Sequence, residues 1–229
     1  MFEAIGQAVS LLISFDPGLY RVIFLTLYVS GSAVVLAALF GVPAGTWLGM
    51  QPKSKVRWLT RLIYTLMGLP PVVGGLLVYM LLSRRGVFGS LELLFTPGAM
   101  IIAQVLLATP IVIGLSSVAV RAKGKEMLDT LRSLGAEPKL ILWTIIREAR
   151  FGILGALIAG FGRVVAEVGA VIMVGGNIEG HTRVMTTAIV LEVRKGNFAF
   201  AMALGLILLA ISFAINAGLY LFQSGGSDE

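Results

Sequence analysis

Two charged residues interrupt a long apolar segment of this chain, and their spacing suits them to guiding an ion. Arg163 and Glu167 stand four residues apart within residues 151–174, so on a continuous helix they would share one face. A charge at the centre of a bilayer costs about 2.5–3.5 kcal/mol on insertion scales, so both side chains should face protein or water and pair. Two interpretations stay open. Arg163 lies beside the path of an anion with Glu167 restraining it, or the two form a structural salt bridge.

A second group of polar residues lies at residues 175–197. Asn177, Thr182 and Arg183 can donate hydrogen bonds, and they precede an apolar run at residues 184–193 that is too short to cross a bilayer. We therefore expect a re-entrant or lateral short helix that closes the outer mouth of a pore. Its polar donors would meet an anion there.

Consecutive prolines interrupt the second apolar stretch. Pro70 and Pro71 lack backbone N–H donors, and Gly74 with the glycine after it loosens the backbone that follows. Irregular backbone at membrane depth is tolerated only against protein or a water-filled cavity. The pattern indicates either a kinked element that lines or gates a pore, or a bent packing helix.

The composition defines the elements that carry these residues. Hydrophobic residues make up 57% of the chain and charged residues 13%, against about 25% charged residues in soluble domains. Long apolar runs in lipid become helices, because their backbone groups must pair internally. We predict an all-α polytopic membrane helix bundle in one domain, residues 1–229, with an amphipathic interfacial helix at residues 1–14. The five predicted spans are residues 22–50, 58–82, 98–120, 151–174 and 198–222.

Small residues recur at every fourth position of the first span. Such a ridge lets the backbone of another helix approach closely, which favours association in lipid. The residues are Ala33, Ala37, Gly41, Gly45 and Gly49.

Most of the 18 Lys and Arg residues lie in the breaks after the first and third spans. Because basic short loops stay cytoplasmic, we expect the N-terminus outside, residues 121–150 inside, residues 175–197 outside and the C-terminus inside. Topology and contact with lipid account for the positive charge, so nucleic acid is not expected as a partner.

The break at residues 121–150 reads as two short helices joined by a sharp turn. Met127, Leu131 and Leu134 should share one face of the first helix, which Gly135 ends in the left-handed conformation. Pro138 suits the first turn of the next helix. The exposed corner favours either insertion into a groove on a partner or an amphipathic loop on the lipid surface.

The stretch DTLRSLGA at residues 129–136 resembles the EAA loop in the permease subunits of ATP-binding-cassette importers. In that loop, Glu-Ala-Ala is followed by a Gly three residues later, and nine further residues lead to Ile-x-Leu-Pro. Asp129 stands at the Glu position, Gly135 at the Gly and Ile145 at the Ile. The two alanines and the Leu-Pro are replaced by Thr-Leu and Arg-Glu.

This resemblance implies a coupling loop that docks into a cleft of a separate ATPase subunit. The residues that it would place at the ATPase are Asp129, Leu131, Leu134, Gly135 and Ala136. The chain has no phosphate-binding Gly-x4-Gly-Lys-Ser/Thr sequence. We therefore expect ATP and Mg²⁺ on the ATPase and no cofactor in this chain.

Residues 67–86 and 166–192 resemble the permeases for oxyanions, most closely the tungstate type, with the molybdate and sulfate types as more distant relatives. The resemblance implies a homodimer of permeases over two ATPase subunits in a prokaryotic inner membrane. It also implies an extracytoplasmic binding protein that delivers the oxyanion, with tungstate expected first and molybdate or sulfate as alternatives.

Three other classes of protein compete with this interpretation. An ion-coupled secondary carrier would need essential acidic residues at mid-membrane, where only Glu167 qualifies. An intramembrane enzyme would need a catalytic pair, but the chain has no Cys, and its one His, His181, lacks both a nucleophile and further metal ligands. A structural membrane scaffold would need no ATPase. We predict neither a catalytic residue nor a metal site.

Overall fold

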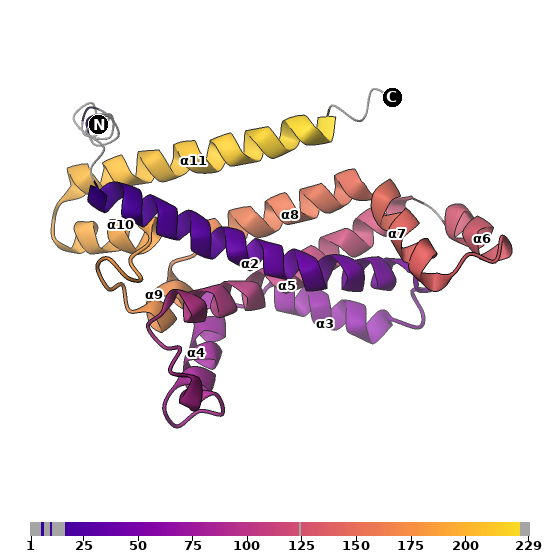
Figure 1. The fold of residues 1–229 in the computed structure, drawn as a ribbon, viewed down its shortest axis with the longest axis horizontal. Coiled ribbons are helices and arrows are strands. Elements are labelled where there is room, and N and C mark those ends of the chain that lie inside the picture. The colour runs from indigo at the N-terminus through magenta and orange to yellow at the C-terminus, as the bar shows by residue number, and fades with distance from the viewer. Residues whose placement is uncertain (1–5, 7–9, 11–16, 124, 225–229) are drawn as a thin grey trace. The chain divides into compact units, whose positions relative to one another are not determined.

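The structure is a computed structural model that describes residues 6, 10, 17–123 and 125–224. All regular elements in this part of the chain are helical, which confirms the predicted all-α fold (Figure 1). Most of the interfacial helix expected at residues 1–14 lies outside the described residues. The elements are α2 (Pro17–Met50), α3 (Arg57–Met67), α4 (Pro71–Leu82), η1 (Gly89–Leu91), α5 (Pro97–Ala122), α6 (Lys125–Ser133), α7 (Pro138–Glu148), α8 (Arg150–Val165), α9 (Gly169–Gly175), α10 (Met185–Arg194) and α11 (Phe198–Ser224).

Three of the predicted spans are single helices. α2, α5 and α11 are each long and apolar enough to cross a membrane, and they cover the spans predicted at residues 22–50, 98–120 and 198–222. Both α2 and α5 continue through an internal proline, Pro43 and Pro110 respectively. Proline therefore does not end these two helices.

The spans predicted at residues 58–82 and 151–174 are each divided into two helices. The first consists of α3 and α4, which are separated at residues 68–70, and the second consists of α8 and α9, which are separated at residues 166–168. Each pair is bent at its break, and the described chain has up to five spans if each pair counts as one. The two prolines predict the first break. The prediction of one continuous helix at residues 151–174 is wrong, because α8 ends at Val165 and α9 begins at Gly169. No proline marks this second break.

The chain forms two compact units, and several helices contribute to both. The first unit comprises residues 1–33, 70–104 and 164–217, and the second comprises residues 34–69, 105–163 and 218–229. Both helix breaks fall at or near a junction between the units in the sequence. The single domain over residues 1–229 stays a prediction.

In the first unit, α10 is anchored on the N-terminal half of α2 and on α11. The backbone N–H of Met185 donates to the hydroxyl oxygen of Thr26 over 2.9 Å, and that hydroxyl donates to the Val22 carbonyl over 2.7 Å. Buried apolar side chains surround this contact. They are Leu19, Met185, Ala188, Ala203, Leu204 and Ile207.

In the second unit, the C-terminal half of α2 packs directly on α5. A Cβ added to Gly41 would lie 2.9 Å from Val112 Cγ1, and one added to Gly45 would lie 2.6 Å from the Ile113 carbonyl oxygen. Real side-chain carbons do not come this close, so only glycine permits this separation of the helices. The close packing predicted from the small-residue ridge is confirmed for this half of α2.

A second core in the same unit joins α6 and α7 to the membrane helices. Leu128 of α6 and Ile145 of α7 are buried with Val120 of α5 and Ile153 of α8. This core holds α6 and α7 against α5 and α8.

Candidate functional site

The segment between α6 and α7 has the predicted helix–turn–helix geometry. Gly135 follows the end of α6 in the left-handed region with φ +72°. Its N–H donates to the Arg132 carbonyl over 3.0 Å, and the N–H of Ala136 donates to the Leu131 carbonyl over 3.1 Å. This pair of bonds is the Schellman motif, which satisfies carbonyls at a helix C-terminus. Pro138 is the first residue of α7, as predicted.

The prediction that Met127, Leu131 and Leu134 share one face of α6 is only partly right. Met127 and Leu131 pack against the core of the second unit, but Leu134 follows the last helical residue and its side chain is 76% exposed. Leu128, which the sequence pattern missed, is buried in that core instead. The turn around Gly135 directs Leu134 away from the core.

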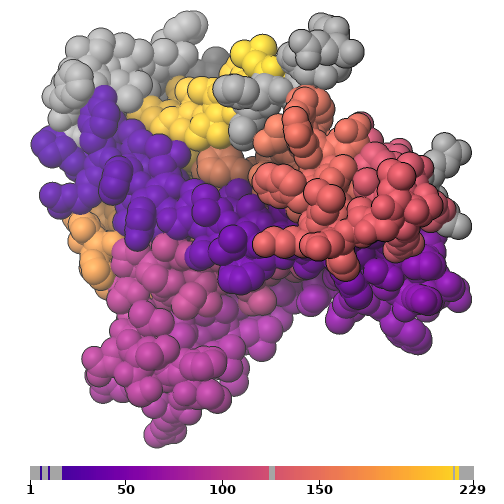
Figure 2. Space-filling model, turned by 45° about the vertical axis from the view of Figure 1, so that its right-hand side comes forward, coloured from indigo at the N-terminus to yellow at the C-terminus, as the bar shows by residue number. Residues whose placement is uncertain are grey.

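Large apolar side chains are exposed along the corner and the following helix. Leu134, Leu140 and Trp143 are 76%, 54% and 67% exposed, and a Cβ added to Gly135 would meet no atom within 4 Å. In Figure 2 the pink and salmon surface of α6 and α7 faces the viewer. Asp129, which is half exposed, forms only a loose ion pair of 3.9 Å with Arg132. This surface exposes large apolar side chains beside a small residue, as both a docking surface and a segment lying on lipid would.

The break at Pro70 and Pro71 begins a new helix. Pro70 is the N-cap of α4 with an extended ψ of 126°, and Pro71 is the first helical residue, where its missing N–H leaves no bond unmade. The Pro70 carbonyl accepts from the N–H of Val73 over 3.0 Å and from that of Gly74 over 3.1 Å. The predicted kink is therefore a complete restart of the helix.

α4 and α9 lie against each other in the first unit (Figure 1). Gly74 is buried, and its neighbour Gly75 makes the close contact: a Cβ added to Gly75 would lie 2.6 Å from Ala170 Cα. Gly169 at the start of α9 approaches Val72 in the same way, with a Cβ-to-Cγ2 distance of 2.8 Å. α4 and α9 thus form one closely packed pair.

Glu167 lies in the break between α8 and α9 and is 4% exposed. Its carboxylate accepts a hydrogen bond from the Ala170 N–H over 3.1 Å, and its backbone carbonyl accepts one from the Thr186 hydroxyl over 3.0 Å. Glu167 therefore accepts from the first turn of α9, just before its N-cap Val168, and connects α9 to α10. The sequence pattern did not identify Thr186, because a threonine in an apolar run has no distinctive signal.

The expectation that Arg163 and Glu167 share one face of a continuous helix is wrong. Arg163 lies in the last turn of α8, which ends at Val165, whereas Glu167 follows the helix end. Because the helix ends between the two residues, their four-residue spacing does not place them on one helical face. An ion pair between the two side chains stays a prediction.

The loop between α9 and α10 is held by its own polar groups. Thr182 is 1% exposed, donates its hydroxyl hydrogen to the Gly175 carbonyl and accepts from the Ile178 N–H over 2.9 Å. A role as a donor to an anion would require the Gly175 bond to break. Asn177 has a positive φ of 53°, and its side-chain oxygen is buried without a hydrogen-bond partner among the described residues.

Arg183 pairs with Glu179 over 3.1 Å in the same loop, and its side chain is 18% exposed. Both line a cavity of about 270 Å³ in the first unit with Arg21, Glu192 and Lys195. The hydrogen bond from Lys195 at 2.8 Å is the main reason that the pKa of Glu192 lies below its usual value. This cavity carries charges of both signs. The predicted short helix at residues 184–193 is present as α10.

The described residues contain no group of His, Cys, Asp and Glu that could hold a metal ion. Apolar helices of spanning length and two broken spans together define a multi-pass helical membrane protein.

Comparison with known proteins identifies its family. The family described as "Binding-protein-dependent transport system inner membrane component" matches residues 41–225, so this chain belongs to that family of importer permeases. It is a transport subunit of the inner membrane, as predicted, and a permease of this family carries no cofactor itself. Membership implies that an ATPase and a binding protein work with it.

Curated relatives cover nearly the whole chain. The tungstate uptake system permease protein TupB of Peptoclostridium acidaminophilum is 43% identical over 96% of this chain and 97% of its own. The TupB protein of Campylobacter jejuni is 39% identical over 94% of this chain and 90% of its own. The molybdenum transport system permease protein ModB of Mycobacterium bovis is 27% identical over 88% and 80%.

A solved structure shares the fold. A crystal structure of an amino acid ABC transporter with histidines matches with a TM-score of 0.57, covering 93% of this chain and 94% of its own. The identity is 19%, so this likeness concerns the fold alone.

Proposed function

We propose that this chain is the membrane-spanning permease of an ATP-driven importer for a tetrahedral oxyanion, with tungstate as the preferred solute. The observation that carries the proposal is the 43% identity to a tungstate permease over 97% of that protein's length. A molybdate importer is the second candidate, since a molybdenum permease is 27% identical over 88% of this chain.

In this proposal two copies of the chain pair over two ATPase subunits, which bind ATP and Mg²⁺. The corner at Asp129, Leu131, Leu134, Gly135 and Ala136 would dock into a cleft of each ATPase. The exposure of Leu134 and the open space around Gly135 support this role. The N-terminus and the α9–α10 loop would face outward, toward a binding protein, and the C-terminus would face the cytoplasm.

Closure of the ATPases would move α6 and α7, and the core around Leu128 and Ile145 would pass that movement to α5 and α8. The pair of α4 and α9 is the proposed gate. Pro70 and Pro71 separate α4 from α3, and the close contact at Gly75 makes α4 move with α9. Arg163, Asn177 and Arg183 are the proposed polar groups along the anion path, with Glu167 and Thr182 holding the loops that carry them.

The test is uptake into proteoliposomes that contain this chain with its ATPase and binding protein. ATP-dependent accumulation of tungstate, competed weakly by molybdate and sulfate, is the expected result. Stronger competition by molybdate than by unlabelled tungstate would assign the solute to the second candidate. Accumulation by this chain alone, without ATPase, would overturn the proposal in favour of an ion-coupled carrier.

A further inference from the structure

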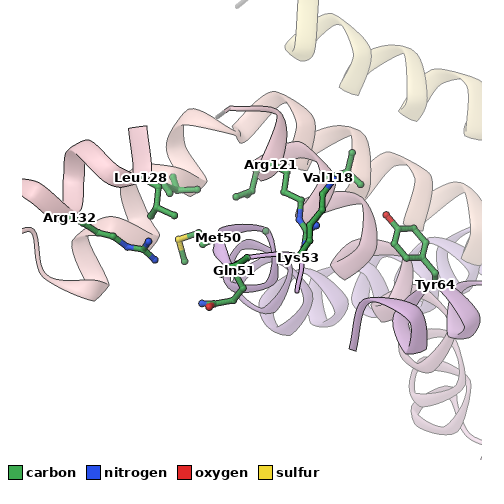
Figure 3. Close-up of a pocket in the computed structure, with 12 residues that line it drawn as sticks. Met50, Gln51, Lys53, Tyr64, Val118, Arg121, Leu128 and Arg132 are labelled. Carbon is green, nitrogen blue, oxygen red and sulfur yellow. The ribbon is translucent and has the colours of Figure 1, made fainter. Parts of the chain in front are cut away.

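A cavity of about 650 Å³ opens in the second unit, between the end of α2, the loop after it, α3, α5 and α6. Figure 3 shows Arg132 on the α6 side of this cavity, Tyr64 on the other side, and Arg121 and Lys53 between them in that view. The lining residues include three cations and, within the described part of the chain, no carboxylate.

Arg121 is the residue that gives this cavity a defined geometry. One terminal nitrogen, Nη2, donates to the Leu48 carbonyl over 3.1 Å, which holds the guanidinium at the end of α2. Its Nε–H is buried and has no acceptor among the described residues. A buried donor without an acceptor is costly, and a guanidinium prefers two parallel bonds to an oxyanion.

Lys53 and Arg132 add positive charge to the same cavity from different segments. Lys53 lies in the loop between α2 and α3, and Arg132 lies in the last turn of α6. Arg132 forms a loose ion pair of 3.9 Å with half-exposed Asp129, and such exposed pairs contribute little to stability. All three cations line one partly enclosed space with no carboxylate among its described lining residues, and a bound anion would balance their charge.

We propose that this cavity binds a tetrahedral oxyanion group of the phosphate type. Arg121 and Lys53 hold the group, and Arg132 approaches it from α6. The group is either a free oxyanion or the phosphate headgroup of an anionic lipid, since both present the same oxygens. Because Arg121 is on α5 and Arg132 on α6, the bound anion restrains the helix–turn–helix segment against the membrane helices. Binding of a free oxyanion or of a lipid headgroup at this cavity does not depend on which solute the transporter carries.

A comparison of two neighbouring lysines can distinguish a binding site from positive charge that only sets the membrane orientation. Lys55 lies two residues from Lys53 in the same loop and is also exposed, but it is not among the residues that line the cavity. Both lysines contribute to the orientation rule in the same way. Lys53→Glu is therefore the test variant, and Lys55→Glu is its charge-matched control.

The first arm uses the full-length chain in nanodiscs of phosphatidylcholine, titrated with sodium tungstate and with inorganic phosphate by calorimetry. Saturable binding that Lys53→Glu weakens at least about tenfold, while Lys55→Glu changes it less than twofold, supports a free oxyanion.

The second arm uses nanodiscs that contain phosphatidylglycerol and no free oxyanion, with native mass spectrometry to detect retained lipid. Retention by the unaltered chain and Lys55→Glu, but not by Lys53→Glu, supports the lipid headgroup.

Equal effects of the two lysine variants, or no binding of either probe to the unaltered chain, would overturn the proposal. Arg132→Gln is a second variant on a half-exposed side chain, with an expected loss of several-fold in the arm that shows binding. Circular dichroism and size exclusion on each variant exclude a folding defect as the cause.

Discussion

Gly75 of α4 and Ala170 of α9 meet so closely that a side-chain carbon on Gly75 would lie 2.6 Å from the Ala170 Cα. The obstacle is backbone, which cannot rotate away as a flexible side chain can. The contact joins two helices that lie far apart in the sequence and that each follow a break in a membrane span. In the proposed gate, this contact is what makes α4 and α9 move as one piece.

Gly75→Ala is therefore expected to destabilise the protein by about 1–3 kcal/mol through overpacking. Gly31→Ala in α2 is the matched control, because a Cβ there meets nothing within 4 Å. Alanine there should even favour the helix by up to about 1 kcal/mol. Thermal unfolding of both variants in one detergent measures the difference, and equal melting temperatures would contradict the close contact.

A bulky residue at Gly135 is expected to uncouple ATP hydrolysis from uptake. The positive φ of Gly135 costs an L-residue about 1–2 kcal/mol, but a side chain there would point into open space on this chain. The effect on coupling would come from the cleft of the ATPase. Gly135→Val should still insert into the membrane, with ATPase activity no longer yielding transport.

Gly196 provides the control for that experiment. It too has a positive φ, +79°, and open space around it, but it lies between α10 and α11 rather than at the coupling corner. Gly196→Val should carry a similar strain and keep coupling intact. Normal coupled transport in Gly135→Val would count against docking at this corner.

Two leucines of the proposed coupling segment, α6 and the turn after it, should respond in opposite ways to substitution. Leu128→Ala removes a buried side chain from the core shared by α5 to α8, so a loss of about 2–5 kcal/mol in the free energy of unfolding is expected. Leu134→Ser changes a side chain that is 76% exposed, so stability should change by less than about 0.5 kcal/mol. Co-purification with the ATPase should nevertheless fall in Leu134→Ser. Unchanged co-purification would remove Leu134 from the docking surface.

Thr182→Val tests whether this residue holds the α9–α10 loop. The substitution keeps the shape of the side chain but leaves the Gly175 carbonyl and the Ile178 N–H without their partner. Each buried unsatisfied group costs about 1–3 kcal/mol, so the melting temperature should fall clearly. Thr182→Ser retains the hydroxyl and should remain close to the unaltered protein. If valine and serine variants melt alike, the hydroxyl has no structural role.

Much of the helix–turn–helix segment of α6 and α7 could be predicted from residue types alone. Gly135 and Pro138 have local conformational preferences, a positive φ and a fixed φ, that act regardless of what surrounds them. The exposure of the Leu134 side chain could not be predicted in this way. Helical periodicity places it with Leu131, but the helix ends before it, and a periodic argument fails at a helix end.

The failure of periodicity at helix ends also explains why the sequence did not predict the break after α8. Glu167 and its neighbours read as the middle of an apolar helix. Bonds to Ala170 on α9 and to Thr186 on α10 instead stabilise a new helix start there. Such bonds join residues 3 and 19 positions apart, and the longer of them exists only after the chain has folded.

The amino-acid sequence by itself determined the class of protein, because apolar length and backbone hydrogen bonding in lipid permit only helices of this kind. It also determined the turn at Gly135 and the restart at Pro71, which depend on the covalent structure of single residues. Only the tertiary structure decided which glycine of the pair after Pro71 meets α9, which leucine of α6 is buried and what Glu167 binds. These outcomes depend on partners distant in the chain, and side-chain chemistry alone does not specify those partners.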